Sequence, residues 1–330
     1  MKMNTNQYFA LALIISFIIT VFITKRLIPF LKKLKMGQKI LDIGPMWHKP
    51  KEGTPTMGGI SFLIATVFTE TVLIILLAFT SDFDVSSLVI TSVFCVTNAL
   101  VGLFDDMTKI RKRQNEGLTP IQKIILQSVI AVGYLSIMHI HGNLSTQLYI
   151  PFFDVNVNLG IFYYVFALIL ILGVVNCANL TDGIDGLAAS VALIINFFFA
   201  AAAVCSQNSS SVILSACICG GCIGFLVYNI HPAKIFMGDT GSLFLGAAAV
   251  GTAFMMNNPL IVLLCGIVYV VEGASVIIQV AVYKAFHRRV FRMAPIHHHF
   301  EKCGMKENGI VMLFCAITFI FCIISIFALV

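Results

Sequence analysis

Apolar segments of about twenty residues recur along this chain, and they constrain its fold more than any other feature. Each segment is long enough to cross a hydrocarbon core about 30 Å thick. Within lipid the backbone must satisfy its own hydrogen bonds, which restricts the chain to helices or a closed barrel. The segments are continuous and do not alternate with polar residues, so they predict helices.

The composition agrees with a membrane protein. Of the 330 residues, 59% are hydrophobic and 11% are charged, whereas a soluble domain carries about 25% charged residues. We therefore predict an all-α, polytopic integral membrane protein, with about ten transmembrane helices in one catalytic domain over residues 1–330. The predicted helices cover residues 8–24, 57–79, 85–104, 121–140, 159–178, 184–204, 212–230, 242–257, 260–282 and 310–330.

The lysines and arginines predict the orientation of these helices. All 21 of them except Lys2 fall in connections that the predicted helices place on one face. The positive-inside rule assigns this face to the cytoplasm and both termini to the extracytoplasmic side. Basic flanks also attract anionic lipid head groups. The net charge of +6 is therefore explained by a membrane surface and requires no nucleic acid.

The polar motifs lie on the same predicted face. The outer connections are short or carry no motif, whereas the inner ones carry aspartates, glycines and histidines. A transporter or channel would place ionisable residues near the bilayer midplane. Only Glu70 and Glu272 are strong candidates there, and each is equally compatible with a functional role and with a paired structural one. A membrane transporter is therefore the alternative from a different functional class.

The segment Asp105-Asp106-Met107-Thr108-Lys109 ends the third predicted helix. Asp105 and Lys109 are four residues apart and share one face of a helix. One carboxylate can then serve as a base or a metal ligand while the lysine holds a phosphate. Taken alone, the segment is equally well described as a charged helix end before a solvated basic run.

Two further segments place aspartates and glycines just before a predicted helix. Residues 176–186 contain Asp182 and Asp185, and residues 236–242 contain Asp239. The start of a helix directs free N–H groups and a positive dipole at an anion, and glycines allow the backbone to approach a ligand closely. Helix capping explains one aspartate in each segment, but it does not explain the pair Asp182 and Asp185.

Three consecutive histidines, His297, His298 and His299, follow the ninth predicted helix. Consecutive side chains of a helix or strand point in different directions, so these three cannot all reach one tetrahedral zinc ion. The common H-E-x-x-H spacing is also missing. Histidine titrates near neutral pH, which suits contacts to phosphate or proton transfer. We therefore favour substrate binding over a zinc site.

The remaining polar residues exclude some chemistry and favour another. The sequence contains neither a Walker loop nor G-x-G-x-x-G, so ATP or dinucleotide binding has no support. The aspartates have no cysteine partners, which fits Mg²⁺, an ion held by one or two carboxylates together with phosphates and water. Aspartates and lysines at one bilayer surface predict phosphoryl transfer, in which catalysis is mostly positioning and electrostatics.

Over essentially its whole length the chain resembles the phospho-N-acetylmuramoyl-pentapeptide transferases, a branch of the polyprenyl-phosphate sugar-1-phosphate transferases. Five motifs in a fixed order carry the resemblance, and the first and last of them indicate this branch. The nearest alternative is a sister transferase that uses UDP-GlcNAc. The motifs are T-P-T-M-G-G (54–59), D-D-x-x-K (105–109), N-L-T-D-G-x-D-G-L-A (179–188), G-D-T-G-S (238–242) and P-x-H-H-H-F-E (295–301).

This resemblance implies a specific reaction at the bacterial cytoplasmic membrane. Phospho-MurNAc-pentapeptide would pass from UDP-MurNAc-pentapeptide to undecaprenyl phosphate, giving lipid I and UMP for peptidoglycan synthesis. One phosphoanhydride replaces another, which agrees with the lack of an ATP motif. The family also implies a homodimer.

The resemblance further implies roles for individual residues. Asp105, Asp106 and Asp239 would form the catalytic centre, with Asp239 as the ligand of Mg²⁺. Either the lipid phosphate attacks the nucleotide-sugar directly or an aspartate first forms a phospho-enzyme; we favour direct attack, because the phosphate is already an anion. The lipid phosphate would meet Lys109, Lys123 and Asn229. The nucleotide-sugar site would contain Lys51, Thr56, Asn176, Asn179, Leu180, Asp182, Asp185, Phe236, Gly238, Gln279, His297, His298 and His299.

Overall fold

A computed structural model describes residues 5–34, 51–78, 85–112 and 117–329 of the chain. Lys2 and some of the basic residues that predict the orientation lie outside these ranges. The described elements are twelve helices and one hairpin. In chain order they are α1 (Thr5–Lys33), α2 (Gly59–Ala78), α3 (Ser86–Lys112), α4 (Pro120–Ile140), β1 (Gln147–Ile150), β2 (Val155–Asn158), α5 (Phe162–Thr181), α6 (Leu187–Cys205), α7 (Ser209–Asn229), α8 (Gly238–Met255), α9 (Ile261–Cys265), α10 (Ile267–Phe286), α11 (Ile296–Lys302) and α12 (Glu307–Phe327).

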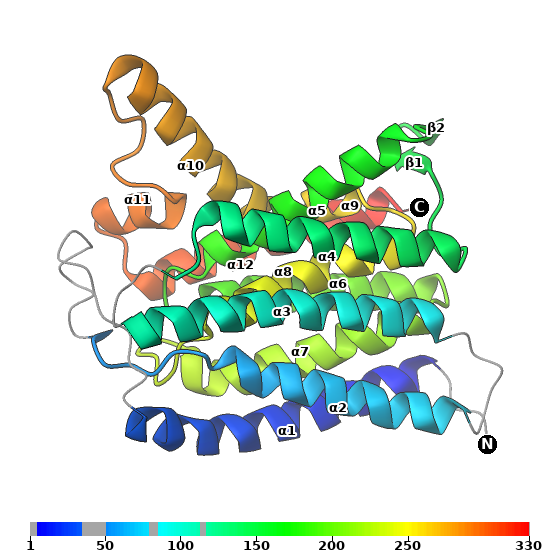
Figure 1. Ribbon diagram of the computed structural model, residues 1–330, viewed down its shortest axis with the longest axis horizontal. Helices are drawn as coiled ribbons and strands as arrows, with labels where there is room; N and C mark the ends of the chain where they lie inside the picture. The colour runs from blue at the N-terminus through cyan, green and yellow to red at the C-terminus, as the bar shows by residue number, and fades with distance from the viewer. Residues whose placement is uncertain (1–4, 35–50, 79–84, 113–116, 330) are drawn as a thin grey trace.

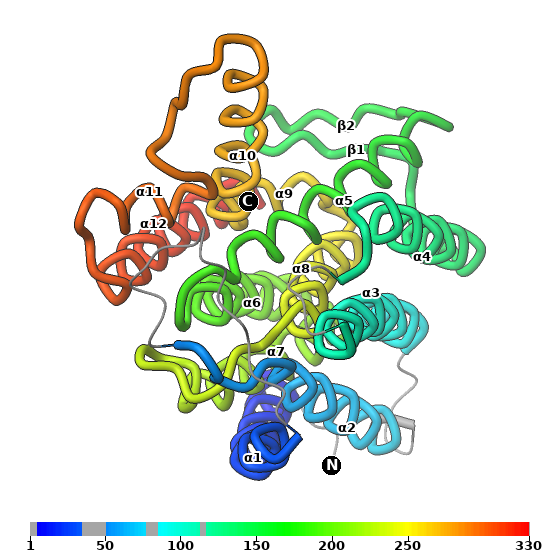
Figure 2. The backbone as a smooth tube through the Cα atoms, turned by 60° about the vertical axis from the view of Figure 1, so that its left-hand side comes forward, coloured from blue at the N-terminus to red at the C-terminus, as the bar shows by residue number. Residues whose placement is uncertain are grey.

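The predicted helical membrane architecture is confirmed. Within the described ranges, nine helices are long and apolar enough to cross a membrane, namely α1 to α7, α10 and α12. The remaining predicted span, 242–257, corresponds to α8, which differs from the others. Its first turn is polar, and every residue from Thr240 to Met255 is buried. Helix α8 is therefore a core helix surrounded by the others (Figure 2), and it needs no lipid-facing apolar surface.

Several elements differ from the sequence prediction. Helix α3 continues to Lys112, so the paired aspartates lie inside the helix and not at its end. The predicted helix 260–282 is interrupted at Gly266, which separates α9 from α10. The connection that the sequence left without structure contains an antiparallel hairpin, in which Leu148 pairs with Val157. Two four-residue strands are too short to stand out beside long apolar segments.

The helices run side by side, and the ends that carry the polar motifs meet at one end of the bundle (Figure 1). The end of α3, the start of α4, the connection between α5 and α6, and α11 all lie there. The start of α1 and the end of α12 lie at the opposite end. Helix α10 leaves the bundle at an angle, and the chain returns through α11 to α12.

Two glycines bring backbones together beneath the polar end. A β-carbon on Gly102 of α3 would lie 2.2 Å from the carbonyl oxygen of Asp239, and one on Gly59 of α2 would lie 2.3 Å from the Cα of Gly241. Non-bonded atoms do not approach this closely, so only glycine fits at either position. Helices α2 and α3 therefore pack directly on the first turn of α8, which fixes Asp239 relative to α3.

Candidate active site

Asp105, Asp106 and Asp239 come together at the polar end of the bundle, as the sequence predicts for a catalytic centre. An oxygen atom from each carboxylate lies within 4.8 Å of the other two. Asp105 and Asp106 are buried on α3, and Asp239 lies in the first turn of α8. This arrangement of hard oxygen ligands can hold a divalent cation such as Mg²⁺.

Two lysines neutralise part of this charge. Lys109 Nζ lies 2.6 Å from Asp105 Oδ2 and 3.1 Å from Asp239 Oδ2. Lys123 Nζ lies 3.4 Å from Asp105 Oδ2 and also forms an ion pair with Asp239. Lys109 is one helical turn beyond Asp105, and Lys123 is in the first turn of α4. Three carboxylates facing two ammonium groups leave one excess negative charge.

Asp106 has a distinct position within this cluster. Its Oδ1 accepts a hydrogen bond from the N–H of Asp239 at 3.1 Å, and its Oδ2 accepts from the N–H and the hydroxyl of Thr240 at 3.0 and 2.7 Å. The first N–H groups of a helix have no partner within that helix, and a negative charge there is favourable. The Asp106 side chain, on α3, therefore caps α8, a task that the sequence did not suggest.

Asn179 links the last turn of α5 to the same cluster. Its Nδ2 donates to Asp239 Oδ1 at 3.1 Å and to Ser242 Oγ at 2.7 Å. The next loop, residues 182–186, contains Asp182 and Asp185, which the sequence predicts to bind the nucleotide-sugar donor, and is therefore named the donor loop. Desolvation, and then the negative charges of Asp239 and Asp106, raise the pKa of Asp182 in this loop well above its usual value. The negative potential of the aspartates therefore extends from the cluster to the donor loop.

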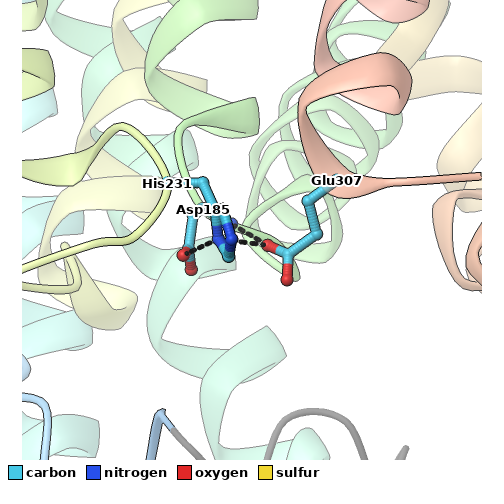
Figure 3. Close-up of side chains that lie close together, drawn as sticks. All are labelled: Asp185, His231 and Glu307. Carbon is cyan, nitrogen blue, oxygen red and sulfur yellow. Dashed lines mark hydrogen bonds and ion pairs between the residues drawn. The ribbon is translucent and has the colours of Figure 1, made fainter.

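A second charged group contacts the other end of the donor loop, and Figure 3 shows three of its members, Asp185, His231 and Glu307. Lys51 Nζ lies 2.8 Å from Asp185 Oδ1 and 2.7 Å from Glu307 Oε2. The Glu307 carboxylate also accepts the N–H of Asp185 at 3.2 Å, and His231 Nδ1 lies 2.8 Å from Asp185 Oδ2. Asp185, His231 and Glu307 have a spacing that could hold a metal ion. The ammonium group of Lys51 contacts both carboxylates, so these residues form an ion-pair network.

The charges around Asp185 change its acidity. Desolvation acts to raise its pKa, but the hydrogen bond and charge of Lys51, followed by His231 and the N–H of Ala233, hold the pKa below the usual value of 3.8. Sequence reasoning missed His231 and Glu307. Glu307 stands in the first turn of α12, where an acidic residue is ordinary, so nothing in the local pattern connects it to Asp185.

The three histidines on α11 have three different partners, as their spacing on a helix predicts. His297 is buried, and its Nδ1 lies 3.0 Å from Oε2 of Glu272 on α10. His298 Nδ1 lies 2.5 Å from Glu301 Oε2. His299 Nδ1 accepts the N–H of Arg292 at 3.1 Å. The structure thus places Glu272, whose role the sequence left open, in contact with a predicted substrate-binding residue.

Two other predicted site residues hold backbone segments. Gln279 Oε1 accepts the N–H groups of Val290 and Phe291 at 3.0 and 2.9 Å, which attaches the returning chain to α10. Asn229 Oδ1 accepts the N–H of Gly186 at 3.1 Å, and its Nδ2 donates to the carbonyl of Ile235 at 2.8 Å. The contact of Asn229 with a lipid phosphate stays a prediction, because both ends of its amide support loops here.

The remaining predicted residues lie around the same end of the bundle. Gly238 has a φ of 70°, and a β-carbon on it would lie 2.6 Å from Asp106 Oδ2 and 3.0 Å from Thr56 Oγ1. The N–H of Phe236 donates to the carbonyl of Pro55 at 2.8 Å. Asn176 faces α4, where its Nδ2 donates to Gln127 Oε1 at 2.8 Å, and Leu180 is half-buried in the last turn of α5.

A helical membrane bundle with this cluster belongs to a known class of transferases. Residues 85–257 match the model of glycosyl transferase family 4, a stretch that contains all three aspartates and both lysines of the cluster. Residues 51–63 match signature 1 of the phospho-N-acetylmuramoyl-pentapeptide-transferases, a stretch that contains Lys51 and Thr56.

Whole-chain comparisons narrow the class to one family. The chain is 41% identical over 325 residues to the phospho-N-acetylmuramoyl-pentapeptide-transferase of Clostridium perfringens (strain SM101), covering 98% of both chains. It is 44% identical over 320 residues to that of Clostridium botulinum (strain Alaska E43), covering 96% of this chain and 95% of the relative. The Clostridioides difficile relative is 40% identical over 317 residues, 96% of both. This chain therefore belongs to the phospho-N-acetylmuramoyl-pentapeptide-transferase family, which confirms the resemblance found in the sequence.

Proposed function

We propose that this chain transfers phospho-MurNAc-pentapeptide from UDP-MurNAc-pentapeptide to undecaprenyl phosphate, giving lipid I and UMP. The observation that carries the proposal is the convergence of Asp105, Asp106 and Asp239 with Lys109 and Lys123 at one end of the bundle, in a member of this family. Phosphoryl transfer requires positioning and charge stabilisation, and the cluster supplies both. By the positive-inside rule, the cluster would face the cytoplasm, both termini would lie outside, and the membrane would be the bacterial cytoplasmic membrane.

Mg²⁺ fits the residues present. The cluster offers only carboxylate oxygens, which this ion prefers, and it carries one excess negative charge. Asp239 would hold the ion with Asp105 beside it, because both oxygens of Asp106 accept hydrogen bonds from the start of α8. When bound, the ion would offset pyrophosphate charge and polarise the reacting phosphorus.

The chemical step would be a direct displacement. An oxygen of the lipid phosphate attacks the β-phosphorus of the nucleotide-sugar, and the bond from that phosphorus to the bridging oxygen breaks to release UMP. Lys109 and Lys123 would hold the anionic groups, and Asp105 would accept a proton if the lipid phosphate carries one. A phospho-enzyme is disfavoured, because Asp105 and Asp239 are ion-paired to lysines and Asp106 caps α8. In this scheme Asp106 is a positioning residue.

The donor would lie along the donor loop and the segments beside it. Asn179 and Gly238 contact the cluster, Lys51 contacts Asp185 of the loop, and His297 lies against Gly183. A homodimer belongs to the proposal as a family expectation, and the mass of the purified protein in detergent or lipid nanodiscs would test it.

The test is release of UMP by purified protein given UDP-MurNAc-pentapeptide, undecaprenyl phosphate and Mg²⁺. We expect release that depends on the lipid and on Mg²⁺ and that is nearly abolished in Asp239→Asn. The matched control is Asp154→Asn, which changes an exposed carboxylate next to the hairpin and should retain wild-type activity. No UMP from folded wild-type protein, or UMP only when UDP-GlcNAc replaces the donor, would overturn the proposal.

A further inference from the structure

Glu272 and His297 form a buried pair that the proposed chemistry does not use. Neither side chain is more than 1% exposed, and His297 Nδ1 lies 3.0 Å from Glu272 Oε2. Glu272 lies in α10, one of the helices able to span a membrane. An ionisable group there is costly unless it is paired, and it commonly marks a functional site. The other polar atoms of the pair, Glu272 Oε1 and His297 Nε2, are buried and have no hydrogen-bond partner among the described residues.

The free nitrogen of this pair faces the donor loop. A β-carbon built on Gly183 would lie 2.1 Å from His297 Nε2. The imidazole ring therefore occupies the space that any larger residue at position 183 would need, and it touches the loop between Asp182 and Ile184. The ring packs against the donor loop at Gly183. The position of the ring depends in turn on Glu272, the partner of Nδ1.

The partner that holds Nδ1 is itself fixed by close packing. A β-carbon on Gly273, next to Glu272, would lie 2.2 Å from Cys177 Sγ on α5. Helix α10 therefore lies against α5 one turn before that helix ends at Thr181 and the donor loop begins. The packing of α10 on α5 therefore fixes the position of Glu272. From there its carboxylate reaches His297 on α11.

We propose that Glu272 is a positioning residue of the nucleotide-sugar site, which holds the ring of His297 against Gly183 and thereby maintains the shape of the donor loop. The inference rests on the proposed function. A carboxylate oxygen accepts hydrogen bonds, so Nδ1 of His297 is the donor in this contact and the contact fixes the orientation of the ring. Carboxylates that orient histidines in this way also support metal ligands, where their loss weakens binding about 10- to 100-fold.

The kinetic test compares Glu272→Gln and Glu272→Ala with matched changes at Glu70. Glu70 is a buried carboxylate in a membrane-spanning helix, α2, and it has no place in the proposed site. We expect the Glu272 variants to raise KM for UDP-MurNAc-pentapeptide about tenfold or more, with KM for undecaprenyl phosphate unchanged. The Glu70 variants should leave both KM values unchanged. Equal effects on both substrates, or equal effects at both positions, would overturn the inference.

A double-mutant cycle tests whether Glu272 acts through His297. If it does, Glu272→Ala should add little to the donor KM of His297→Ala, because interacting residues are not additive. Full additivity would show that Glu272 acts by another route. Where Glu272→Ala does not fold, Glu272→Gln in the same cycle keeps the test decisive, because Gln has the same shape and lacks the charge.

A spectroscopic measurement separates this inference from the proposed function. In protein labelled with ring-¹⁵N histidine, the His297 resonances can be assigned by their loss in His297→Gln. We expect Nδ1 to be protonated in the wild type and its shift to change in Glu272→Gln but not in Glu70→Gln. If the wild type releases no UMP from any donor, the proposed function fails while this result still stands. Identical His297 shifts in wild type and Glu272→Gln would refute the positioning role.

Discussion

The proposed catalytic cluster and the supports of the donor loop draw on different parts of the chain. Every member of the catalytic cluster (Asp105, Asp106, Lys109, Lys123 and Asp239) lies within residues 85–257, the stretch that matches glycosyl transferase family 4. The supports of the donor loop come from both sides of that boundary: Asn229 and His231 lie within the stretch, whereas Lys51, Glu272, His297 and Glu307 lie outside it.

This difference separates the residues proposed to react from many of those that hold the loop proposed to bind the donor. The reacting groups are carried by helices that pack on one another through glycine contacts and a shared cap, so they form a fixed centre. The loop beside them is held by side chains from the N-terminal signature and from the last third of the chain. Substitutions in the cluster should therefore reduce the rate of reaction with any donor, whereas substitutions among the loop supports should change donor affinity.

The largest effect is expected inside the cluster. Lys109→Gln removes a cation that contacts both Asp105 and Asp239, so we expect kcat to fall about 10³-fold, the loss typical of removing one preorganised charge or donor from a reacting centre. Lys112→Gln, at an exposed position on the same end of α3, is the control and should retain its kcat. Steady-state UMP release measures both. A Lys109→Gln enzyme with normal kcat and raised donor KM would contradict the assignment of the cluster to the chemical step and of the loop supports to donor affinity.

The next effect is expected at the contact between the donor loop and α11. Gly183→Ala would force its new methyl group into the ring of His297, and overpacking of this kind costs about 1–3 kcal/mol. We expect kcat/KM for the donor to fall about 10- to 100-fold, with partial recovery in the double variant carrying His297→Ala. Gly173→Ala, where no atom lies within 4 Å of the added carbon, is the control. A tolerated Gly183→Ala would show that the loop moves freely against α11.

A smaller effect is expected at the other end of the donor loop. Glu307→Gln removes one of the two carboxylates that contact Lys51 and leaves Asp185 in place. Loss of one hydrogen bond to a charged group costs about 1.5 kcal/mol, so we expect donor KM to rise about tenfold at constant kcat. Glu52→Gln, an exposed change beside Lys51, should have no effect. A fall in kcat alone would assign Glu307 to the chemistry.

The smallest effect concerns the dependence of stability on pH. The pKa of Asp185 is held below its usual value of 3.8, so its ionised form stabilises the folded protein above that pH. This contribution must be lost as the pH falls through the lowered pKa. We expect the difference in Tm between wild type and Asp185→Asn to be constant from about pH 7 to 5 and to shrink below about pH 4. A difference that grows in acid would contradict the assigned direction of the shift.

The sequence predicts the parts of this fold that depend on long apolar segments and on compact motifs. The helices are set by the bilayer, which demands continuous apolar residues, and the aspartates stand in motifs that can be read locally. The break at Gly266 was missed because its apolar flanks continue on both sides. Helix α8 was predicted as a span although its surroundings are other helices, since an apolar segment does not reveal whether lipid or protein covers it.

The site residues that escaped prediction depend on contacts between distant segments. Glu307 has an ordinary helix-start position, and His231 stands in a short connection between α7 and α8, so neither has a local pattern that points to Asp185. Glu272 was noticed because a carboxylate in an apolar helix is unusual, yet its partner could not be named from the sequence alone. Asp106 was predicted as one of a catalytic pair, and only the packing of α3 on α8 reveals that it is a cap.

Because Asp106 caps α8, the alignment of α3 with α8 can be measured without any substrate. The amide protons of Asp239 and Thr240 are both held by this one carboxylate, so they can exchange with solvent only when α8 opens away from α3. Hydrogen exchange reports the free energy of such local opening. The exchange rates of these two backbone amides thus measure how often Asp106 and Asp239 lose their alignment in the resting protein.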